Sequence, residues 1–387
     1  MTTLPAPSSA ARIHSEKLIA HIQREIQLAG GLIDFAHFMN LALYAPGLGY
    51  YTAGTHKLGR SGDFVTAPEI SPLFAKCLAK QFQAILITLD KKDILEFGAG
   101  SGIFAKDLLL ELEQLNSLPQ HYYILEVSAE LRDRQLRRFA AECPQFLSRI
   151  IWLDSLPKTP FTGIIFANEV LDAMPVHRFE WSENKIKECC VAWENKQFIW
   201  QNQTPSAALQ ERVAAILQEC VLPDFYRSEV SLMQGAWIHS IADILQQGVL
   251  FLVDYGYGRH EYYHPERQDG TLTCFYQHHH HHNPFTLIGL QDITAHVDFT
   301  YVAESADQAG LQVVGFTSQA AFLLACGLLE ISELSSHHEI DKYTNNQAIK
   351  TLTLPSQMGE IVKVMALGKQ VEIPLSGFAL QDRRGNL

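Results

Sequence analysis

A glycine-rich segment that follows Glu96 is the first place where residue types and spacing could do chemistry. Glycines stand at positions 98, 100 and 102 of this segment, after an apolar stretch that reads as a strand. Such a turn between a strand and a helix lets the backbone approach a ligand and presents a helix N-terminus to it. A dinucleotide-binding fingerprint would need a third glycine at position 103, where this chain has Ile103. The spacing is therefore GxGxG, which also occurs in tight turns that hold no ligand.

Polar residues also follow the next two predicted strands. Glu126 ends a strand predicted over 122–127, where a carboxylate can accept hydrogen bonds from two ribose hydroxyls. Asp154 and Ser155 follow a strand predicted over 150–153. The alternatives are that Glu126 is a charge favoured by the dipole of the following helix, and that Asp154 and Ser155 are ordinary polar residues at a strand end.

The fourth predicted strand, 163–167, is followed by Asn168, Glu169 and Asp172. The carboxyl ends of parallel strands form the ligand crevice of a doubly wound sheet, so these side chains should face the reacting group. The alternative is a solvated helix start whose acids are favoured by the helix dipole.

The elements that must position these residues alternate between strands and helices from residue 93 onward. Strand 93–97, helix 103–115, the strand over 122–127, helix 129–142 and the two strands above predict βαβ crossovers in a parallel, doubly wound sheet. Further strands are predicted over 249–254, 311–317 and 360–367, with helices over 305–309 and 319–330.

Two regions lie outside this alternation. Before it come helices predicted over 13–28, 34–44 and 71–89, with a loop over 54–69. Inside it, strands 176–181, 186–194 and 197–201 indicate an antiparallel meander, followed by helices over 207–220 and 236–245. We therefore divide the chain into an N-terminal part with a lid loop (1–90), a first core part (91–175), an insertion (176–245), a second core part (246–370) and a tail (371–387). The segment 50–69 is expected to fold over the ligand and to help form the substrate pocket.

Composition excludes several function classes. The 387 residues contain 30 basic and 42 acidic side chains, a net charge of −12, which argues against a nucleic-acid surface. The longest apolar run, near 320–329, is shorter than the ~18–20 residues of a membrane span, and the N-terminus lacks a signal-peptide core. Seven cysteines without CxxC spacing argue against zinc ribbons and disulfide scaffolds. We expect a cytoplasmic protein with no nucleic-acid partner and no membrane insertion.

The glycine turn with its preceding acid resembles motif I of class I S-adenosylmethionine methyltransferases. Further blocks resemble the methyltransferase family that includes the mitochondrial complex I assembly factor, a protein arginine methyltransferase. These blocks span about residues 40 to 365 in order: 43–51, 62–69, 96–102, 126–132, 168–175, 254–256, 270–272 and 289–299.

This resemblance implies a Rossmann-like class I fold, an α/β architecture with a doubly wound, mostly parallel seven-stranded sheet, an N-terminal helical extension and the inserted meander. It implies S-adenosyl-L-methionine as cofactor, with the acid of motif I near the methionine ammonium and the third strand end near the adenine amino group. The implied cofactor-binding residues are Glu96, Gly98, Ala99, Gly100, Ser101, Gly102, Glu126, Asp154, Ser155 and Asn168.

The resemblance also implies a protein substrate with a reacting arginine. A guanidinium stays protonated and is a poor nucleophile, but carboxylates can bind its N–H groups in a fork and draw charge away from the attacking nitrogen. Our candidates for this catalytic role are Glu169, Asp172, Asp63 and Glu69, with Asp254 and Asp292 as second choices. Asp63 could instead cap a turn, and Asp292 a helix.

Two other functions stay open. The chain could methylate a small molecule in a pocket lined by Tyr50, Tyr51 and Phe64, or it could be a non-catalytic assembly chaperone that retains the cofactor site. The run His278–His282 is expected to be a solvated loop and no metal is expected, since adjacent histidines cannot all converge on one ion. The resemblance places a bacterial member in the cytoplasm and the eukaryotic relative in the mitochondrial matrix. A homodimer is left open.

Overall fold

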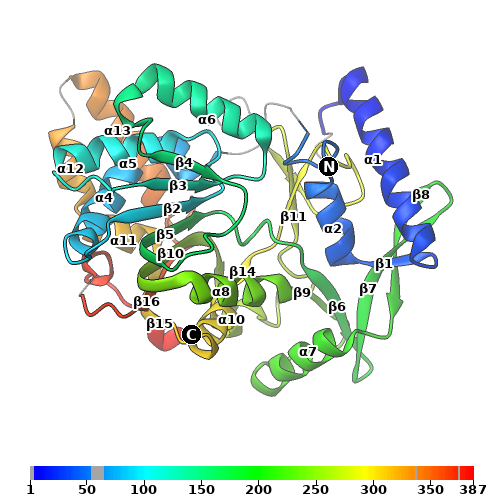
Figure 1. Ribbon diagram of the computed structural model, residues 1–387. Helices are drawn as coiled ribbons and strands as arrows, with labels where there is room; N and C mark the ends of the chain where they lie inside the picture. Colours follow the sequence, from blue (N-terminus) through cyan, green and yellow to red (C-terminus); the bar gives the residue numbers. More distant parts are fainter. Residues whose placement is uncertain (1–3, 54–64, 336–337, 374) are drawn as a thin grey trace. The chain divides into compact units, whose positions relative to one another are not determined.

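The computed structural model describes residues 4–53, 65–335, 338–373 and 375–387 (Figure 1). The chain forms two compact units, each built from three stretches of sequence. The first unit comprises Met1–Phe64, Asp172–Ala236 and Tyr257–Asp298, and the second comprises Val65–Leu171, Trp237–Gly256 and Phe299–Leu387. The five-segment division made from the sequence stays a prediction.

The second unit contains a seven-stranded path in the order β15-β16-β10-β5-β2-β3-β4. Neighbouring strands from β10 to β4 run parallel, whereas β16 runs antiparallel to both β10 and β15. Chain order reverses between β2 and β5, which creates the switch point where ligands bind in doubly wound sheets. This topology confirms the Rossmann-like class I prediction. The strands are β2 (Asp93–Phe97), β3 (Tyr122–Leu125), β4 (Ile150–Leu153), β5 (Phe161–Asn168), β10 (Leu245–Tyr257), β15 (Gln312–Ser318) and β16 (Val362–Lys369).

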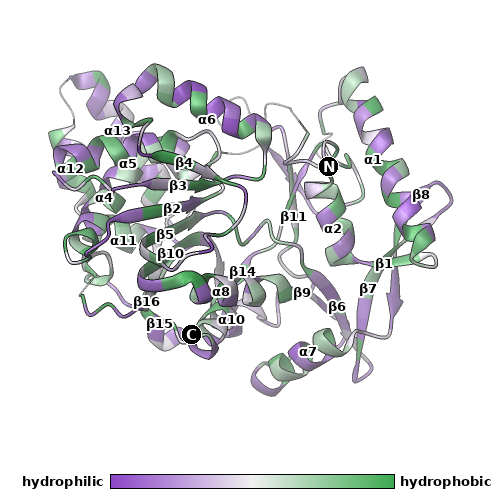
Figure 2. Ribbon diagram, viewed as in Figure 1, coloured by the Kyte–Doolittle hydropathy of each residue, from purple (hydrophilic) through white to green (hydrophobic). Residues whose placement is uncertain are grey.

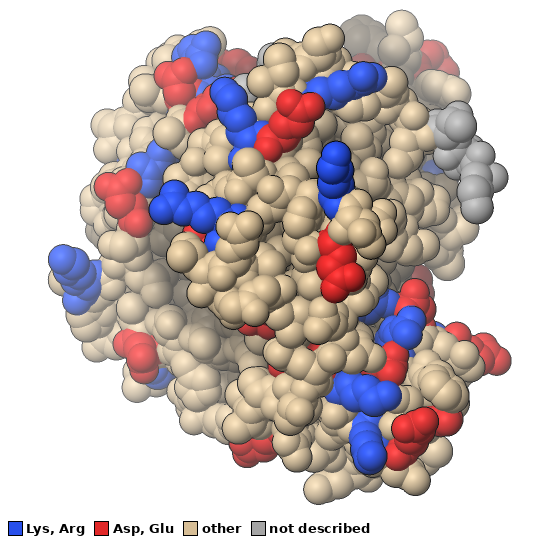
Figure 3. All heavy atoms as spheres, turned by 90° about the vertical axis from the view of Figure 1, so that its right-hand side faces the viewer, with Lys and Arg blue, Asp and Glu red and all other residues tan. Residues whose placement is uncertain are grey.

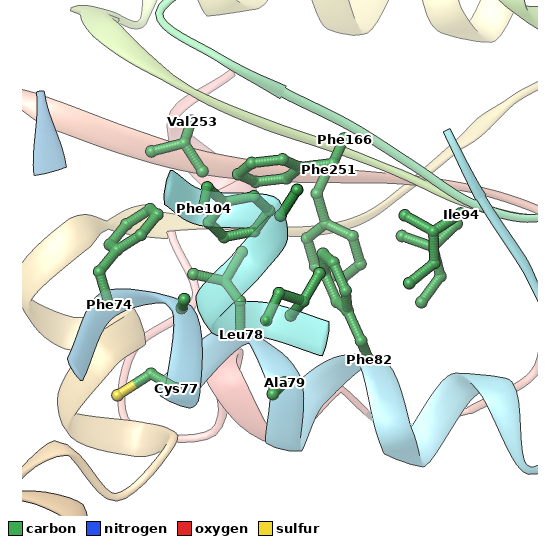
Figure 4. Packing of buried hydrophobic residues seen from close by; sticks show 14 of the residues in the cluster. Phe74, Cys77, Leu78, Ala79, Phe82, Ile94, Phe104, Phe166, Phe251 and Val253 are labelled. Atoms are coloured by element: carbon green, nitrogen blue, oxygen red, sulfur yellow. The ribbon is translucent and has the colours of Figure 1, made fainter. Parts of the chain in front are cut away.

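Helices pack against this sheet and bury an aromatic core. Phe82 of α4 lies 5.9 Å from Phe166 of β5 and 5.2 Å from Phe251 of β10, between ring centroids (Figure 4). Phe104 of α5 stacks on Phe166 at 4.3 Å. Strands covered on both faces become almost continuously apolar, which is the pattern of β5 and β10. The helices are α3 (Ala67–Ile70), α4 (Pro72–Leu86), α5 (Ile103–Gln114), α6 (Ala129–Glu142), α10 (Phe299–Gln308), α11 (Gln319–Ala325), α12 (Leu328–Leu334) and α13 (Glu339–Thr353). Short 3₁₀ helices are Pro144–Phe146, Ser376–Phe378 and Arg384–Asn386, and α8 (Leu232–Ile244) includes the boundary between the units at Ala236.

The first unit confirms the predicted meander as β6 (His177–Ser182), β7 (Lys185–Glu194) and β8 (Gln197–Gln203), all paired antiparallel. The sheet is larger than predicted, because β1 (Leu32–Asp34) pairs with β7 and β9 (Tyr226–Val230) pairs with β6. Helices α1 (Ser9–Leu28), α2 (Phe35–Tyr44), α7 (Ala207–Glu219) and α9 (Arg259–Tyr262) complete it, with a small sheet of β11 (Thr273–Tyr276), β12 (His279–His281) and β13 (Asp292–Thr294), and the short β14 (Val297–Asp298). Helix α1 buries Leu18, Ile22 and Ile26, one position every turn, and Figure 2 shows hydrophobic and hydrophilic residues alternating along it.

Three local predictions were wrong. The helix expected over 319–330 is two helices, because Gly327 adopts a left-handed φ of 85° between α11 and α12. The loop expected up to residue 69 already turns into α3 at Ala67. Within the expected histidine loop, His279–His281 form strand β12 against β11.

Acidic and basic side chains are interspersed on the face drawn in Figure 3, so this face has no large patch of a single charge. None of the helices among the described residues has both the length and the apolar character needed to cross a bilayer.

Candidate active site

The glycine turn begins where β2 ends and closes where α5 begins. Gly98, Gly100 and Gly102 have φ values of 61°, 54° and 77°, in the left-handed region that side chains disfavour. The amide of Gly98 donates to the carbonyl of Leu125 at 3.0 Å, so the turn is tied to the end of β3. Three left-handed glycines in five residues keep side chains away from this edge and leave the backbone open to a ligand.

Glu96, on the strand that leads into the turn, is buried at 3% exposure. Its carboxylate accepts a hydrogen bond from the Tyr122 hydroxyl at 2.8 Å. Burial raises the pKa of Glu96 to about 8; the Tyr122 hydrogen bond opposes this rise and the nearby Glu126 adds to it. A buried carboxyl of this kind is poised to ionise when a cation such as an ammonium group comes beside it.

Glu126 follows β3 and is also buried, at 5% exposure. Its carboxylate accepts the Ser128 amide at 3.0 Å and the side-chain amide of Gln135 at 3.3 Å. Burial raises its pKa, whereas hydrogen bonds from Ser128, Gln135 and the Gly100 backbone oppose the rise. A carboxylate offers about four acceptor positions, so these three donors leave one for a ligand hydroxyl. The next residue, Val127, is 65% exposed and gives the same edge an apolar surface.

The third strand end is fixed by Arg132 of α6. Its guanidinium donates to the Glu126 carbonyl at 2.8 Å, to the Asp154 carboxylate at 2.7 Å and to the Leu153 carbonyl. Asp154 and Ser155 are exposed. One arginine therefore joins the ends of β3 and β4, and the Asp154 carboxylate that was predicted to contact the cofactor is paired with it.

The fourth strand end forms a strained turn beside the glycine turn. Phe97 of β2 pairs with Ala167 of β5, so both strands end at the same level. Glu169 has a φ of 51°, and its amide donates to the Val253 carbonyl at 2.8 Å. The Asn168 side-chain amide donates to the Glu169 carboxylate at 3.4 Å. The other amide atom of Asn168, Oδ1, is buried and has no hydrogen-bond partner among the described residues.

Asp254 of β10 holds this turn through its carboxylate. Its Oδ2 accepts the amides of Val170 at 3.2 Å and Leu171 at 2.8 Å, and its Oδ1 accepts the amide of Tyr255 at 2.8 Å. The side chain is 1% exposed. Asp254, a second-choice substrate carboxylate in the sequence analysis, is thus engaged with the backbone around Glu169.

Glu69 also reaches the glycine turn. The Ser101 hydroxyl donates to its carboxylate, and Arg138 of α6 donates to the same hydroxyl oxygen at 3.0 Å. Asp63 and most of the predicted lid loop, residues 54–64, lie outside the described residues.

The remaining acidic candidates, Asp172 and Asp292, belong to the first unit. The Tyr51 hydroxyl donates to Asp292 at 2.9 Å, and its ring stacks on Tyr44 at 5.4 Å between centroids. Burial raises the pKa of Tyr51 well above 10, and the charges of Asp292 and Asp172 add to the rise, so both carboxylates lie near this tyrosine. The predicted pair Glu169 and Asp172 is divided between the two units, separated along the chain by Val170 and Leu171 alone.

Sequence reasoning missed the side chains that hold the site together. Tyr122, Gln135 and Trp152 were assigned to elements but to no role. A signal was present in α6, where Arg132, Gln135 and Arg138 recur every three residues and mark one polar face of the helix. Among the described residues, no group of three or more His, Cys, Asp or Glu side chains could hold a metal ion.

These features fit S-adenosyl-L-methionine. The left-handed glycines give backbone space, the Glu126 carboxylate has an acceptor position for a ribose hydroxyl, and Val127 exposes an apolar side chain for a base. The buried Glu96 carboxyl and the Asn168 Oδ1, which has no partner in the described part of the chain, are acceptors suited to an ammonium group.

Comparisons with known proteins agree with this site. Residues 75–317 match the model of the Methyltransf_28 family, described as "Putative S-adenosyl-L-methionine-dependent methyltransferase". A crystal structure from Burkholderia thailandensis bound to S-adenosyl-homocysteine is 38% identical over the whole of both chains, with a TM-score of 0.95. A native structure from the same organism is also 38% identical over both chains, with a TM-score of 0.92.

Curated relatives include the mitochondrial protein arginine methyltransferase NDUFAF7 homologue of Drosophila melanogaster, 26% identical over 97% of this chain and 91% of the relative. The human protein arginine methyltransferase NDUFAF7 is 26% identical over 90% of this chain and 83% of its own length. The chain belongs to this family of S-adenosyl-L-methionine-dependent methyltransferases, which includes the mitochondrial protein arginine methyltransferases.

Proposed function

We propose that this methyltransferase transfers the methyl group to an arginine side chain of a protein. The proposal is supported by the curated relatives, which carry that activity in their names at about a quarter identity over most of the chain. The single observation that carries it is the strained turn at Glu169, where the chain puts a carboxylate in a conformation that glycine would adopt without strain.

A non-glycine residue at positive φ costs about 1 kcal/mol or more and persists where the surroundings impose it. Here the Val253 carbonyl and the Asp254 carboxylate impose it through three backbone amides, those of Glu169, Val170 and Leu171. Strain of this kind clusters at functional sites, so the turn supports a role for the Glu169 side chain beyond packing.

The chemistry of arginine explains why a carboxylate is needed. The guanidinium is protonated at neutral pH and presents a planar fork of donors that carboxylates match with paired hydrogen bonds. Glu169 and Asp172 would hold the guanidinium and draw its charge away from the attacking nitrogen. Asp63 and Glu69 are proposed as further acids on the substrate side. The bound cofactor supplies the methyl group, and the protein aligns the acceptor nitrogen with it, which is mainly proximity and orientation.

The test is to incubate the purified protein with methyl-labelled cofactor and extracts of a strain that lacks it, with separate protein and metabolite fractions. Label in protein that yields methylarginine on hydrolysis supports the proposal. Mass spectrometry of the proteome with and without the gene then identifies the arginine that loses its methyl groups. A subunit of a respiratory complex is the substrate class that the family resemblance suggests. Label confined to metabolites would overturn the proposal.

A small-molecule acceptor is the second candidate. It is favoured by the stacked, partly buried rings of Tyr44 and Tyr51 beside Asp292 in the first unit. Of the residues predicted to line such a pocket, Tyr50 is fully buried and Phe64 lies outside the described residues. In the experiment above it predicts label in the metabolite fraction. A chaperone without catalytic activity would leave both fractions unlabelled. The cytoplasmic location and a homodimer also stay predictions.

A further inference from the structure

Helix α6 directs three polar side chains, one every three residues, toward the ends of neighbouring strands. Arg132 joins the ends of β3 and β4, and Arg138 reaches the Ser101 hydroxyl in the glycine turn. Gln135 lies between them on the same face and is completely buried, with 0% exposure. Burying a side-chain amide costs free energy unless its hydrogen bonds are made, so the partners of Gln135 indicate its role.

Gln135 contacts three separate parts of the cofactor edge. Its Nε2 donates to the Gly100 carbonyl at 2.9 Å and to the Glu126 carboxylate at 3.3 Å. Its Oε1 accepts the indole N–H of Trp152, on β4, at 2.8 Å. The side chain of one residue thus joins the glycine turn, the carboxylate after β3, and β4.

The orientation of this amide is fixed by its partners. The Trp152 indole nitrogen only donates and the Gly100 carbonyl only accepts, as does the Glu126 carboxylate in its charged form. Rotating the amide by 180° would place oxygen against the two acceptors and N–H groups against the indole N–H. The two donors of Gln135 must therefore point at Gly100 and Glu126.

Gly102 provides the space for this arrangement. A Cβ atom at Gly102 would lie 3.2 Å from the Gln135 Cγ and 3.4 Å from the Phe139 ring. The third glycine of the motif thus serves two purposes, because it adopts a φ of 77° and also lets α6 bring Gln135 against the turn.

We propose that Gln135 is a positioning residue for the cofactor, which fixes the Gly100 backbone and the Glu126 carboxylate relative to each other before the ligand arrives. We expect the ligand to meet both groups at once, since Gly100 belongs to the glycine turn and Glu126 has one acceptor position for a ribose hydroxyl. Gln135 acts through these two groups and is itself covered by them. This role of Gln135 belongs to the cofactor site and does not depend on which acceptor is methylated.

The first test is calorimetric titration of S-adenosyl-homocysteine into the full-length protein carrying Gln135→Leu. Loss of both donors should weaken binding at least tenfold. The matched control is Gln319→Leu, in the same unit, where an equally buried glutamine donates to the Leu352 carbonyl in another part of the unit. The control should lower thermal stability and leave the dissociation constant within twofold of the wild type. Equal losses of affinity in both variants, or none in Gln135→Leu, would refute the proposal.

A second variant separates positioning from packing. Gln135→Glu keeps the size of the side chain but places a carboxylate against the Glu126 carboxylate and the Gly100 carbonyl. One shared proton would restore a donor at low pH, so affinity relative to the wild type at the same pH should improve at least tenfold from pH 8 to pH 6. Taking this ratio reduces the effect of Glu96, which titrates in both proteins, and Arg132 is a charged group of α6 near Glu126 in both. A ratio that does not change with pH would show that Gln135 only fills space.

A double-mutant cycle provides the last check. If Gln135 acts partly through Glu126, the loss of affinity caused by Gln135→Leu should be at least threefold smaller in a Glu126→Gln background than in the wild type. Additive losses would contradict the coupling between these two residues.

Discussion

The carboxylate of Asp254 accepts the backbone amide of Leu171 at 2.8 Å, which joins β10 to the turn that carries Glu169. The same oxygen accepts the amide of Val170 at 3.2 Å. A buried acid near the carboxyl end of one parallel strand thus holds the backbone that follows its neighbour. The charged carboxylate of Asp254 therefore stabilises the backbone conformation of the turn that contains Glu169.

Replacing Asp254 by asparagine should therefore separate positioning from binding. The amide keeps the size of the side chain but loses the charge, and its NH₂ group competes for the position that faces the two backbone amides. We expect unfolding to become easier by about 1–3 kcal/mol. Methyl transfer at saturating cofactor should fall at least tenfold, with the affinity for S-adenosyl-homocysteine within threefold of the wild type. Asp107→Asn in α5, which removes a buried carboxylate paired with Lys106 at 3.2 Å, is the control for a general loss of stability. Unchanged turnover in Asp254→Asn would contradict this role.

The buried Glu96 predicts a specific pH dependence of stability. Burial raises its pKa to about 8 in the folded protein, against an ordinary value of 4.5. Between these two values the folded state binds a proton that the unfolded state has released, so stability falls as pH rises from about 5 to 8. The contribution is fully present below the unfolded pKa, is lost above the folded one, and changes by at most ~1.4 kcal/mol per pH unit. Urea unfolding of the free protein at several pH values should show this slope, and Glu96→Gln should remove it. An unaltered slope in that variant would assign it to other groups.

A substitution at Gly100 tests whether the cofactor binds against the glycine turn. Gly100→Val forces a branched side chain into a φ of 54° and into the space that the ligand needs, so cofactor binding should be abolished. The matched control is Gly310→Val, because Gly310 has a φ of 77° and a Cβ there would meet no heavy atom within 4 Å. Both variants should lose about 1–3 kcal/mol of stability through backbone strain, yet only the first should lose binding of S-adenosyl-homocysteine in calorimetry. If Gly100→Val still bound S-adenosyl-homocysteine, the ligand would not lie against this turn.

Local signals predicted much of the fold. Strands β2 and β4 and helix α6 have the predicted bounds, because an apolar run, a glycine turn and an N-cap serine each act over a few residues. Pairing between distant segments left no such signal. Leu32 of β1 pairs with Ala192 of β7, and only the folded chain brings them together. Helix α13 was missed because polar residues dominate it, including the consecutive Asn345 and Asn346.

The candidate site was predictable to a similar degree. Glu96 lies near the end of β2, and Glu126 and the glycines follow strands directly, so topology alone placed them at one edge. The partners of Gln135 depend on how α6 packs over three strands, which residue spacing in one helix does not specify. Equally, nothing in the run from Asn168 to Asp172 showed that Glu169 and Asp172 belong to different compact units.

The contact between Glu69 and Ser101 predicts how the segment before α4 affects the cofactor. The Ser101 hydroxyl donates to the Glu69 carboxylate and accepts from Arg138, so it joins α3 and α6 through the glycine turn. Ser101→Ala should raise the dissociation constant of S-adenosyl-homocysteine several-fold. Glu69→Gln, which still accepts this hydrogen bond, should have a smaller effect on binding. If Glu69→Gln instead lowers turnover at saturating cofactor with binding intact, Glu69 acts on the substrate, as the sequence analysis proposed.

The proposed catalytic carboxylates, Glu169 and Asp172, can each be replaced by the matching amide. Glu169→Gln replaces a charged, two-oxygen acceptor by an amide with one acceptor atom, and Asp172→Asn does the same three residues later. If either side chain holds the substrate guanidinium, turnover at saturating cofactor should fall by ~2–4 kcal/mol of transition-state stabilisation, which is roughly 30- to 1000-fold. Affinity for S-adenosyl-homocysteine should stay near that of the wild type, because the cofactor contacts of the glycine turn and Glu126 are retained. Glu111→Gln is the control, since this partly buried carboxylate of α5 pairs with Lys76 at 3.6 Å and should leave turnover unchanged. Full activity in both Glu169→Gln and Asp172→Asn would exclude the pair and transfer the role to Asp63, Glu69 or Asp292, each of which the same assay can test by the corresponding amide.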